Sequence, residues 1–568
     1  MVWQNEINEL NKRLEMAQGM GGQEGIDRQH SNGKLTVRER VQAISDPGTF
    51  KELSALAGSA RYEDNELVAF TPYPRVIGTA HLGGMRVMLD GGDFTVRGGA
   101  GERGTGSQPS SLKYALQWRI PLVRLLDAVG GSVRTFEQIG RTYLPDGGGT
   151  SKAVDLLNEV PVVSAVLGSV AGLPAIEACL CHFSVMVKDT SQVFAGGPPV
   201  VKAALGYDVT KEDLGDHNSQ VFKTGVIDNL AESEEEAFKM IRQFLSYMPS
   251  SVWKKPGRVD THDNPIRKED GLLSIIPRRS KRKYDPYKIL EYVMDHDSFF
   301  EIAPFYGQSK ITGLARVDGY PVGVLMNNPN QLGGSTNVAS GEKTIRLVGL
   351  CETFHLPIVS FVDEPGFMVG LDAQNQGIVR AGARLVIANA RSQTPWISFY
   401  IRQAYGVAGQ TNHRPSGMYH RYAWPSAKWG SMHIEGGVSA AYRREIAAAE
   451  NPEQKRLDIE ARLQAMASPF RTAEDTGGES SSHGIDIIDP RDTRPLLCDF
   501  VEMTQDMLDT QLGPPHFSLY SLVYLAFNRS GHINRQDVAS KIPNKQSTSI
   551  PPRLVNNQGS KGTGNFLI

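Results

Sequence analysis

The chain has 568 residues, of which 40% are hydrophobic and 21% are charged, and its formal net charge is −2. This length exceeds what one hydrophobic core supports, so we expect two domains of ordinary size. The small net charge excludes a general electrostatic attraction to nucleic acid or to an anionic membrane. The four cysteines are too scattered for a disulfide scaffold, and no second Cys/His pair completes a zinc pattern around Cys179 and Cys181.

The first thirty residues contain four glutamates and no apolar segment, so the sequence predicts a short surface helix there and no targeting peptide. The most apolar stretch, residues 162–187, is interrupted by Pro174, Glu177 and His182. These interruptions favour a buried strand and helix over a membrane span. The few cysteines suit a reducing compartment, and we expect a cytoplasmic location, with the mitochondrial matrix left open.

Strand-like and helix-like segments alternate along both halves of the chain. In the first half, the β-rich runs "RVMLD" and "PVVSAVLG" flank "SLKYALQWRIPLVRLLDA", whose apolar residues recur at helical spacing. In the second half, "VGVLMNN", "PIVSFVD" and "PWISFYI" accompany the helical pattern "GEKTIRLVGLCETFH". This alternation predicts a layered α/β fold in both halves.

A well-marked helix and a polar segment separate the halves. Ser233 and Glu236 form a capping-box pattern at the start of that helix, and Pro249 follows its end. The segment after it is polar and broken by prolines, so the boundary lies near residues 250–275. The basic run at 278–283 favours a solvated linker end over a nucleic-acid patch, and the tail from residue 533 is expected to be flexible.

The two halves also match each other in sequence, which should be examined before any fold is inferred. Gly78 and Gly84 lie opposite Gly313 and Gly319, both at an offset of 235 residues. Further matches follow in the same order with offsets that rise from 236 to 240: Asp127 with Asp363, Gly130 with Gly366, Ala171 with Ala408, and Gly196 with Gly436. This slow drift predicts a duplicated domain with small loop insertions.

Several segments resemble familiar binding or catalytic motifs but lack the spacing or the neighbouring elements that these motifs require. "GAGERG", from Gly99, has the spacing of a dinucleotide fingerprint, but no helix opens directly after it. "GEKT" lacks the spacing of a P-loop, and "GSVAG" is not a nucleophile elbow. Asp363 and Glu364 are adjacent, yet neighbours on a strand point to opposite faces, so they do not form an acid and base pair and one is expected to be structural.

What remains are turns of small residues at strand ends, "SVAG" at 169–172 and "GVAG" at 406–409. A backbone N–H can approach a developing oxyanion only where side chains do not crowd it. One such turn is better explained by tight packing of a strand on a helix. Two of them at equivalent places in duplicated halves favour a pair of oxyanion sites.

These residues lie within long stretches that resemble a known family. Nearly the whole chain, from Gly33 to about Tyr520, is similar to the carboxyltransferase β subunit of biotin-dependent acyl-CoA carboxylases, the group that includes the propionyl-CoA and methylcrotonoyl-CoA enzymes. The matching stretches include "GKLTVRERVQAISDPGTF", "FSVMVKDTSQVFAGGPPVVKAALGYDVTKEDLG", "YDPYKILEYVMDHDSFFEI", "FVDEPGFMVG" and "YAWPSAKWGSM".

The resemblance implies an α/β fold of two tandem crotonase-like domains related by internal duplication. We divide the chain into an N-terminal extension, two carboxyltransferase domains and a flexible tail, with bounds at residues 1–30, 31–265, 266–532 and 533–568. It further implies that a carboxyl group moves from carboxybiotin to the α or vinylogous carbon of an acyl-CoA. The cofactor supplies the base, and the protein supplies position and oxyanion stabilisation.

Carried over residue by residue, the enolate hole corresponds to the amides of Val407 and Ala408, where the family more often has Gly before Ala. Gly406, Gly409 and Gln410 of the same turn are expected to contact the substrate. Gly409 replaces an aromatic residue and Gln410 an Asp or a branched apolar residue, which suggests a bulkier or polar acyl group.

The first-half hole corresponds to Gly130 and Gly131, which are also the expected contacts of biotin. Because "DAVGGSVR" has one residue more than the family segment, this register is less well defined. Ala171 and Gly172 are expected to shape the coenzyme A channel. Gly366 and Phe367 complete the expected substrate contacts.

The chain has no Met-Lys-Met biotinylation motif and no ATP-grasp glycine loop. The resemblance therefore implies partner chains that provide biotin carboxylase and the biotin carrier, and a homo-oligomer, expected to be a hexamer. Two other functions stay open. One is a decarboxylase subunit or another crotonase-fold CoA-thioester enzyme, and the other is a non-catalytic structural paralogue.

Overall fold

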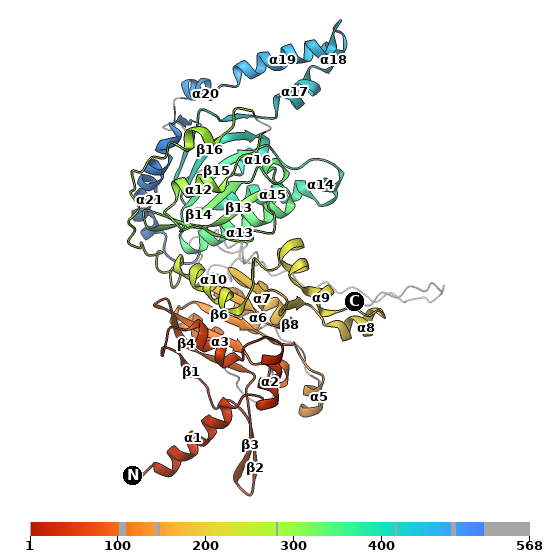
Figure 1. The fold of residues 1–568 in the computed structure, drawn as a ribbon, viewed down its shortest axis with the longest axis vertical. Helices are drawn as coiled ribbons and strands as arrows, with labels where there is room; N and C mark the ends of the chain where they lie inside the picture. The colour runs from red at the N-terminus through yellow and green to blue at the C-terminus, as the bar shows by residue number, and fades with distance from the viewer. Residues whose placement is uncertain are drawn as a thin grey trace, which may run out of the picture. The chain divides into compact units, whose positions relative to one another are not determined.

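The fold was examined in a computed structural model that describes residues 2–100, 110–142, 144, 148–279, 282–414, 417–476, 478 and 484–515. Most of the "GAGERG" loop, two residues of the basic run at 278–283, and the predicted tail from 533 lie outside the described residues. The described segments form one compact unit within Met1–Leu522 (Figure 1).

Two sheets with the same strand order form the centre of the two halves. In the described part of the chain, the first sheet has the order β1 (Lys51–Leu53), β4 (Arg75–Leu82), β5 (Met85–Gly92), β6 (Leu122–Leu126), β7 (Val162–Val166), β9 (Phe183–Val187), β11 (Asn229–Ala231). The second has the order β12 (Phe300–Glu301), β13 (Lys310–Val317), β14 (Tyr320–Asn327), β15 (Ile358–Glu364), β16 (Trp396–Tyr405), β17 (Tyr419–Ala423), β19 (Asp486–Ile487). In each sheet the first three strands pair antiparallel and the others parallel.

Shorter strands lie beside the sheets. The strand β18 (Lys428–Gly430) pairs with the end of β16. Two further two-stranded sheets are formed by β2 (Gly58–Glu63) with β3 (Glu66–Pro72), and by β8 (Ser169–Ala171) with β10 (Gln192–Phe194).

Helices connect the strands and cover both faces of each sheet. The first half has α1 (Gln4–Gln18), α2 (Gln23–Ser31), α3 (Val37–Ile44), η1 (Arg97–Gly99), α4 (Ser111–Trp118), α5 (Arg134–Ile139), α6 (Gly148–Leu156), α7 (Leu173–Cys179), α8 (Pro198–Leu205), α9 (Lys211–Gly215), η2 (Asn218–Lys223), α10 (Glu234–Ser246). The second has α11 (Leu272–Ile275), α12 (Tyr287–Val293), η3 (Leu332–Gly334), α13 (Val338–Phe354), α14 (Leu371–Asn375), α15 (Ile378–Arg391), α16 (Gly406–Gln410), α17 (Ile434–Ala441), α18 (Arg443–Ala447), α19 (Pro452–Met466), α20 (Pro469–Thr476), η4 (Pro490–Asp492), α21 (Thr493–Thr510).

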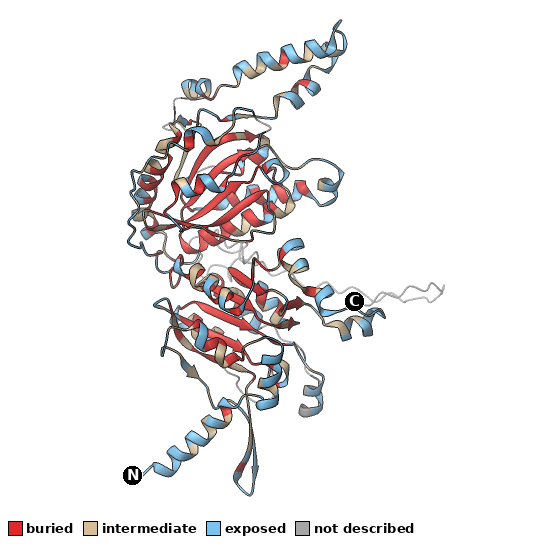
Figure 2. Cartoon of the chain, in the orientation of Figure 1, coloured by how far each residue is buried: buried red, intermediate tan, exposed pale blue. Residues whose placement is uncertain are grey.

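Both faces of the central strands are buried, because helices cover them on each side. In the first half α3 and α10 cover one face, and α4 and α7 cover the other. In the second half α12 and α21 share a core with one face, while α13 packs on the other. Figure 2 shows the central strands of both sheets as buried, whereas α1, the β2–β3 hairpin and α19 are largely exposed.

Backbone conformation repeats together with strand order. Arg97 and Leu332, each the first residue of a short helix after the hairpin, both have a positive φ, of 53° and 49°. Arg119 and His355 end α4 and α13 with φ of 52° and 58°. L-residues rarely adopt this left-handed conformation, so its recurrence at matching positions supports the duplication that the sequence offsets predict.

The predicted helix before the linker is present as α10. Ser233 caps it by accepting a hydrogen bond from the Glu236 amide at 3.2 Å. The Glu236 carboxylate accepts from the amide of Glu232, not from that of Ser233. The cap is therefore one-sided, and the reciprocal capping box predicted from sequence is wrong in that detail.

A buried carboxylate follows the same strand in each half. Asp127, after β6, pairs with Arg40 at 3.0 Å, and the same guanidinium binds Glu234 at 2.8 Å. In the second half, Asp363 near the end of β15 pairs with Arg402 at 2.8 Å. Because an unpaired buried charge is very costly, these arginines fix the strand ends relative to the helices around them.

Replacing Arg40 by Met should destabilise the chain by about 3–5 kcal/mol, because Asp127 and Glu234 would lose their shared buried cation. Urea unfolding followed by circular dichroism should show a clear fall in the unfolding midpoint. The control is Arg28→Met, which removes the exposed partner of Glu24 and should cost less than about 1 kcal/mol. Equal midpoints for the two variants would contradict the role of the buried pairs.

Candidate functional site

The second-half turn lies at the carboxyl end of β16, where the strand passes directly into the short helix α16. Gly406 makes this change of direction with a φ of 60°, a conformation that favours glycine. The first amides of a helix have no acceptor inside it, and Val407 and Ala408 lie in the first turn of α16. The Val407 side chain is 53% exposed, whereas Ala408 is buried.

The carbonyl of Ala408 holds the turn in place. It accepts hydrogen bonds from the Thr411 amide at 3.0 Å, from the Thr411 hydroxyl at 2.7 Å and from the Asn412 side-chain amide at 3.0 Å. Three donors on one oxygen leave little freedom for the peptide units before it. The turn therefore presents amides whose positions are set in advance.

Gly409 and Gln410 lie on different sides of α16. Gly409 is buried, and a side-chain carbon there would approach the Ala404 carbonyl carbon to 3.0 Å. Close packing against β16 thus gives a reason for glycine at this position that sequence alone did not reveal. Gln410 is exposed at the end of the helix.

The loop after β15 lies close to the turn. The Gly366 amide donates to the Glu364 carboxylate at 3.1 Å, and the Gly366 carbonyl accepts from the Thr336 amide at 3.1 Å. Phe367 forms an isolated β-bridge with Thr336, and its ring lies against Gly382 of α15. The Gly366 φ of 134° is a further position that favours glycine.

His433, which the sequence analysis did not single out, links that loop to the turn. Its Nε2 lies 2.9 Å from the Pro365 carbonyl oxygen, and its ring centroid lies 4.0 Å from that of Tyr405, with the two ring planes tilted by 40°. Since a carbonyl only accepts, Nε2 carries the proton and donates it. No sequence pattern marks His433, because its partners lie far away along the chain.

The first-half residues gather at a second strand end. A side-chain carbon at Gly130 would lie 3.2 Å from the Ala171 carbonyl oxygen and 3.4 Å from the Gly172 Cα. Gly172 has a φ of 66° and precedes α7. Gly131 is exposed beside them. The fold thus brings Gly130 together with Ala171 and Gly172.

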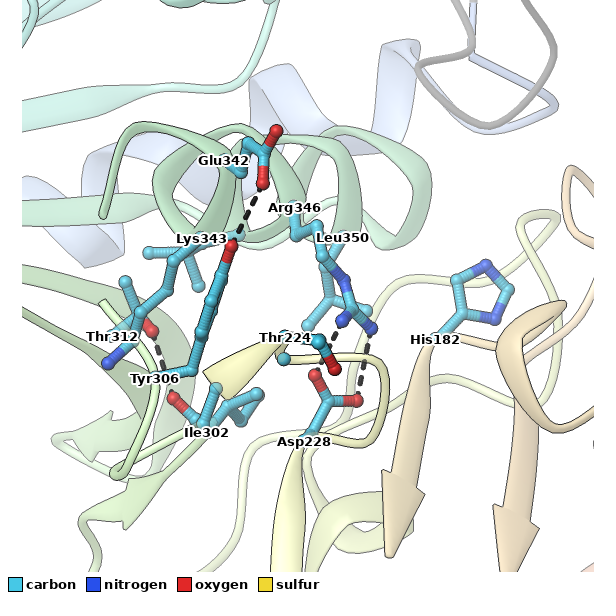
Figure 3. Close-up of a pocket in the computed structure, with 13 residues that line it drawn as sticks. His182, Thr224, Asp228, Ile302, Tyr306, Thr312, Glu342, Lys343, Arg346 and Leu350 are labelled. Carbon is cyan, nitrogen blue, oxygen red and sulfur yellow. Dashed lines mark hydrogen bonds and ion pairs between the residues drawn. The ribbon is translucent and has the colours of Figure 1, made fainter. Parts of the chain in front are cut away.

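A cavity of about 80 Å³ lies where α13 faces the first half (Figure 3). Arg346 of α13 pairs with Asp228 at 2.7 Å, and the Tyr306 hydroxyl donates to Glu342 at 3.0 Å. The volume suits a few water molecules and is well below that of a site for a coenzyme-sized ligand. The cavity therefore belongs to the packing of the two halves.

Buried groups at this cavity are engaged in structural contacts. His182 accepts from the Val162 amide through Nδ1 and donates to the Leu157 carbonyl through Nε2, and burial lowers its pKa to about 3. Burial also lowers the pKa of Lys343 to about 8, and its Nζ donates to the Lys310 carbonyl at 2.9 Å. His182 is therefore neutral at pH 7 and has no free ring nitrogen for proton transfer.

Within the described ranges, no group of three or more His, Cys, Asp and Glu side chains is arranged to hold a metal ion. Among the same residues, no helix combines the length and the apolar character that a membrane crossing requires.

Comparison with known proteins shows the family of the chain. Residues 28–511 match the model of the carboxyl transferase domain. The chain is 32% identical over 524 residues to the propionyl-CoA carboxylase carboxyltransferase subunit of Haloferax mediterranei, covering 91% of this chain and 99% of that relative. It is 29% identical over 521 residues to the methylmalonyl-CoA decarboxylase subunit alpha of Veillonella parvula, covering 90% and 98%.

The fold is also similar to that of a solved structure. The crystal structure of transcarboxylase 12S, described as a hexamer assembly with methylmalonyl-coenzyme A and methylmalonic acid bound, has a TM-score of 0.78 and 27% identity over 88% of this chain and 95% of that chain. This likeness confirms the predicted α/β fold of two tandem crotonase-like domains. The chain belongs to the carboxyl transferase domain family and is an acyl-CoA carboxyltransferase subunit of the biotin-dependent type.

Proposed function

We propose that the amides of Val407 and Ala408 bind the enolate oxygen of an acyl-CoA thioester while a carboxyl group is transferred to its carbon. The observation that carries this proposal is the start of α16, where the amides of Val407 and Ala408 follow Gly406 in the first turn and the Ala408 carbonyl is held by three donors. Donors fixed before the reaction stabilise developing charge without reorganisation. An oxyanion also suits the electropositive first turn of a helix.

The small residues at the strand end of the first half suit the cofactor chemistry of the family. When bound, carboxybiotin supplies the carboxyl group and then the base that removes the α-proton. We assign its contact to Gly130 and Gly131, and the coenzyme A channel to Ala171 and Gly172. The close approach of Gly130 to Ala171 supports this assignment, since a larger side chain would obstruct the strand end.

The acyl group is proposed to lie near Gly406, Gly409 and Gln410, with Gly366 and Phe367 on the adjoining loop. The exposed amide of Gln410 beside the exposed Val407 supports an acyl group that is bulkier or more polar than acetyl. The relatives are named for propionyl-CoA and methylmalonyl-CoA, which makes short branched esters the first substrates to test.

The partners follow from the family. A biotin carboxylase and a biotin carrier on separate chains provide the carboxyl group, and this chain forms a homo-oligomer, which we propose to be a hexamer like transcarboxylase 12S. Apolar side chains exposed on the second half, among them Val369 and Leu371 at 83% each, support a surface covered by another subunit. The cytoplasmic location stays a prediction.

We further propose that residues 31–265 and 266–532 are the two carboxyltransferase domains, with residues 1–30 as an extension. The matching strand orders of the two sheets support this division, because each segment contains one complete sheet. The polar segment between α10 and α11 supports a boundary near residue 265.

The direct test is a decarboxylation assay on the purified chain. Malonyl-, methylmalonyl- and 3-methylglutaconyl-CoA would be incubated with and without free biotin, and loss of the carboxyl group would be followed by mass spectrometry. We expect loss from at least one ester that depends on biotin, since biotin accepts the carboxyl group in the reverse half-reaction. Equal loss without biotin would favour another CoA-thioester enzyme, and loss from no ester would favour a non-catalytic paralogue.

A second test removes one amide of the turn. Val407→Pro lacks the N–H, and the first turn of a helix tolerates proline, so kcat should fall about 10²- to 10³-fold. Val407→Ala is the matched control, because it shortens the same side chain and keeps the amide. Steady-state kinetics on the ester identified above give both values, and an equal kcat for the two variants would rule out the Val407 amide as a donor.

A further inference from the structure

A buried ion pair lies directly beneath the α16 turn. Lys310, the first residue of β13, places its Nζ 2.8 Å from Oε2 of Glu364, the last residue of β15. Their side chains are 1% and 0% exposed. The solvation energy lost when two charges are buried can exceed the energy of their attraction. Stability alone therefore does not explain why this buried ion pair is present.

Groups other than Lys310 also bind the Glu364 carboxylate, two of them at the same Oε2 atom. It accepts from the Asn327 side-chain amide at 3.0 Å, from the Thr336 hydroxyl at 2.6 Å and from the Gly366 amide at 3.1 Å. These donors fix the position of the carboxylate. Burial lowers the pKa of Lys310, while the negative charge of Glu364 opposes that shift.

Lys310 connects this carboxylate to the turn through Asn412. Its Nζ donates to the Asn412 Oδ1 at 2.6 Å, and the Asn412 Nδ2 donates to the Ala408 carbonyl at 3.0 Å. A lysine ammonium can only donate, so it decides which end of the Asn412 amide faces it. The other end, the NH₂ group, must then face Ala408.

The first half builds the same sheet without this connection. Ala128 occupies the position that matches Glu364, directly after the shared buried aspartate. Arg75, which matches Lys310, pairs with Asp90 of the neighbouring strand at 2.7 Å. The Lys310–Glu364 pair is therefore not a requirement of the repeated fold, and it occurs in the half that carries the proposed enolate turn.

We propose that Lys310 and Glu364 are positioning residues that act through Asn412 to hold the Ala408 carbonyl, and with it the amides that face the enolate. The inference rests on the proposed function of that turn. Neither side chain reaches solvent, so neither touches the substrate. Their effect is on the geometry of the donors.

The test uses two variants in the full chain. Asn412→Leu removes the connection and leaves the ion pair intact. The double variant Lys310→Met, Glu364→Gln removes both charges together, so no unpaired charge stays buried. The control is Arg494→Met in a chain that also carries Asp295→Asn, so that this buried pair is removed without leaving Asp295 as an unpaired charge. Neither residue contacts α16 among the described residues.

Two readouts are compared with the wild-type chain: amide hydrogen exchange in the peptide spanning residues 404–412, and kcat and KM for biotin-dependent decarboxylation. We expect both variants to exchange about tenfold faster in that peptide. We also expect kcat to fall about 10- to 100-fold, with KM within about twofold, because displaced donors weaken transition-state contacts. The control, Arg494→Met with Asp295→Asn, should leave exchange in this peptide and kcat unchanged.

The inference is overturned if Asn412→Leu matches this control in both readouts. If the double variant does not fold, Asn412→Leu decides alone. A wild-type chain that decarboxylates no ester would contradict the proposed function, and hydrogen exchange would still decide the positioning. Faster exchange in Asn412→Leu would then support the connection, and unchanged exchange would reject it.

Discussion

The carboxylates of Asp127 and Asp363 have no access to solvent, and both halves of the molecule are built around the cations that compensate them. Each aspartate follows the same strand of its sheet, at the end where parallel strands meet the loops. An arginine reaches it from a different element in each half, Arg40 from α3 and Arg402 from β16. The strand ends are thereby fixed to their surroundings before any loop is added. The small-residue turns begin at strand ends held in this way. The oxyanion sites that we propose for them require such rigidity, because donors that move with the substrate stabilise it less.

The two halves share this aspartate but differ in the residue that follows it. Ala128 adds no charge to the first half, whereas Glu364 brings a second buried carboxylate, with its own lysine, to the second. The repeated fold uses the aspartate in both halves, whereas the glutamate that follows it is present in the second half alone. Burying an additional ion pair gives no assured gain in stability, so its retention is better understood as a constraint on geometry. Through Lys310 and Asn412, this ion pair is connected by hydrogen bonds to the carbonyl oxygen of Ala408.

Sequence predicted the parts of this molecule that depend on local pattern. Strand and helix periodicity gave the α/β class, and the ordered offsets gave the duplication, because both are recorded in neighbouring residues. Asp363 and Glu364 were expected to point to opposite faces with one of them structural, and both prove to be held in separate buried networks. The connection through Lys310 and Asn412 could not be predicted, since its members are distant in sequence and each is unremarkable alone. The role of His433 could not be predicted for the same reason.

Three ionisable groups near the second-half turn, Lys310, Glu364 and His433, are already engaged in the described part of the chain. Lys310 and Glu364 are paired and sealed from solvent, and the Nε2 proton of His433 is donated to a backbone carbonyl. Side chains bound in this way are poor candidates for proton transfer, which needs a group free to change its protonation state. Chemistry at such a turn is then best served by a reaction whose acid and base come with the substrates. Transfer of a carboxyl group from carboxybiotin meets that condition, because the protein has only to align two ligands and to stabilise one oxygen. When the cofactor supplies the base and the protein supplies alignment and oxyanion stabilisation, a buried network that fixes the backbone contributes directly to the protein's part.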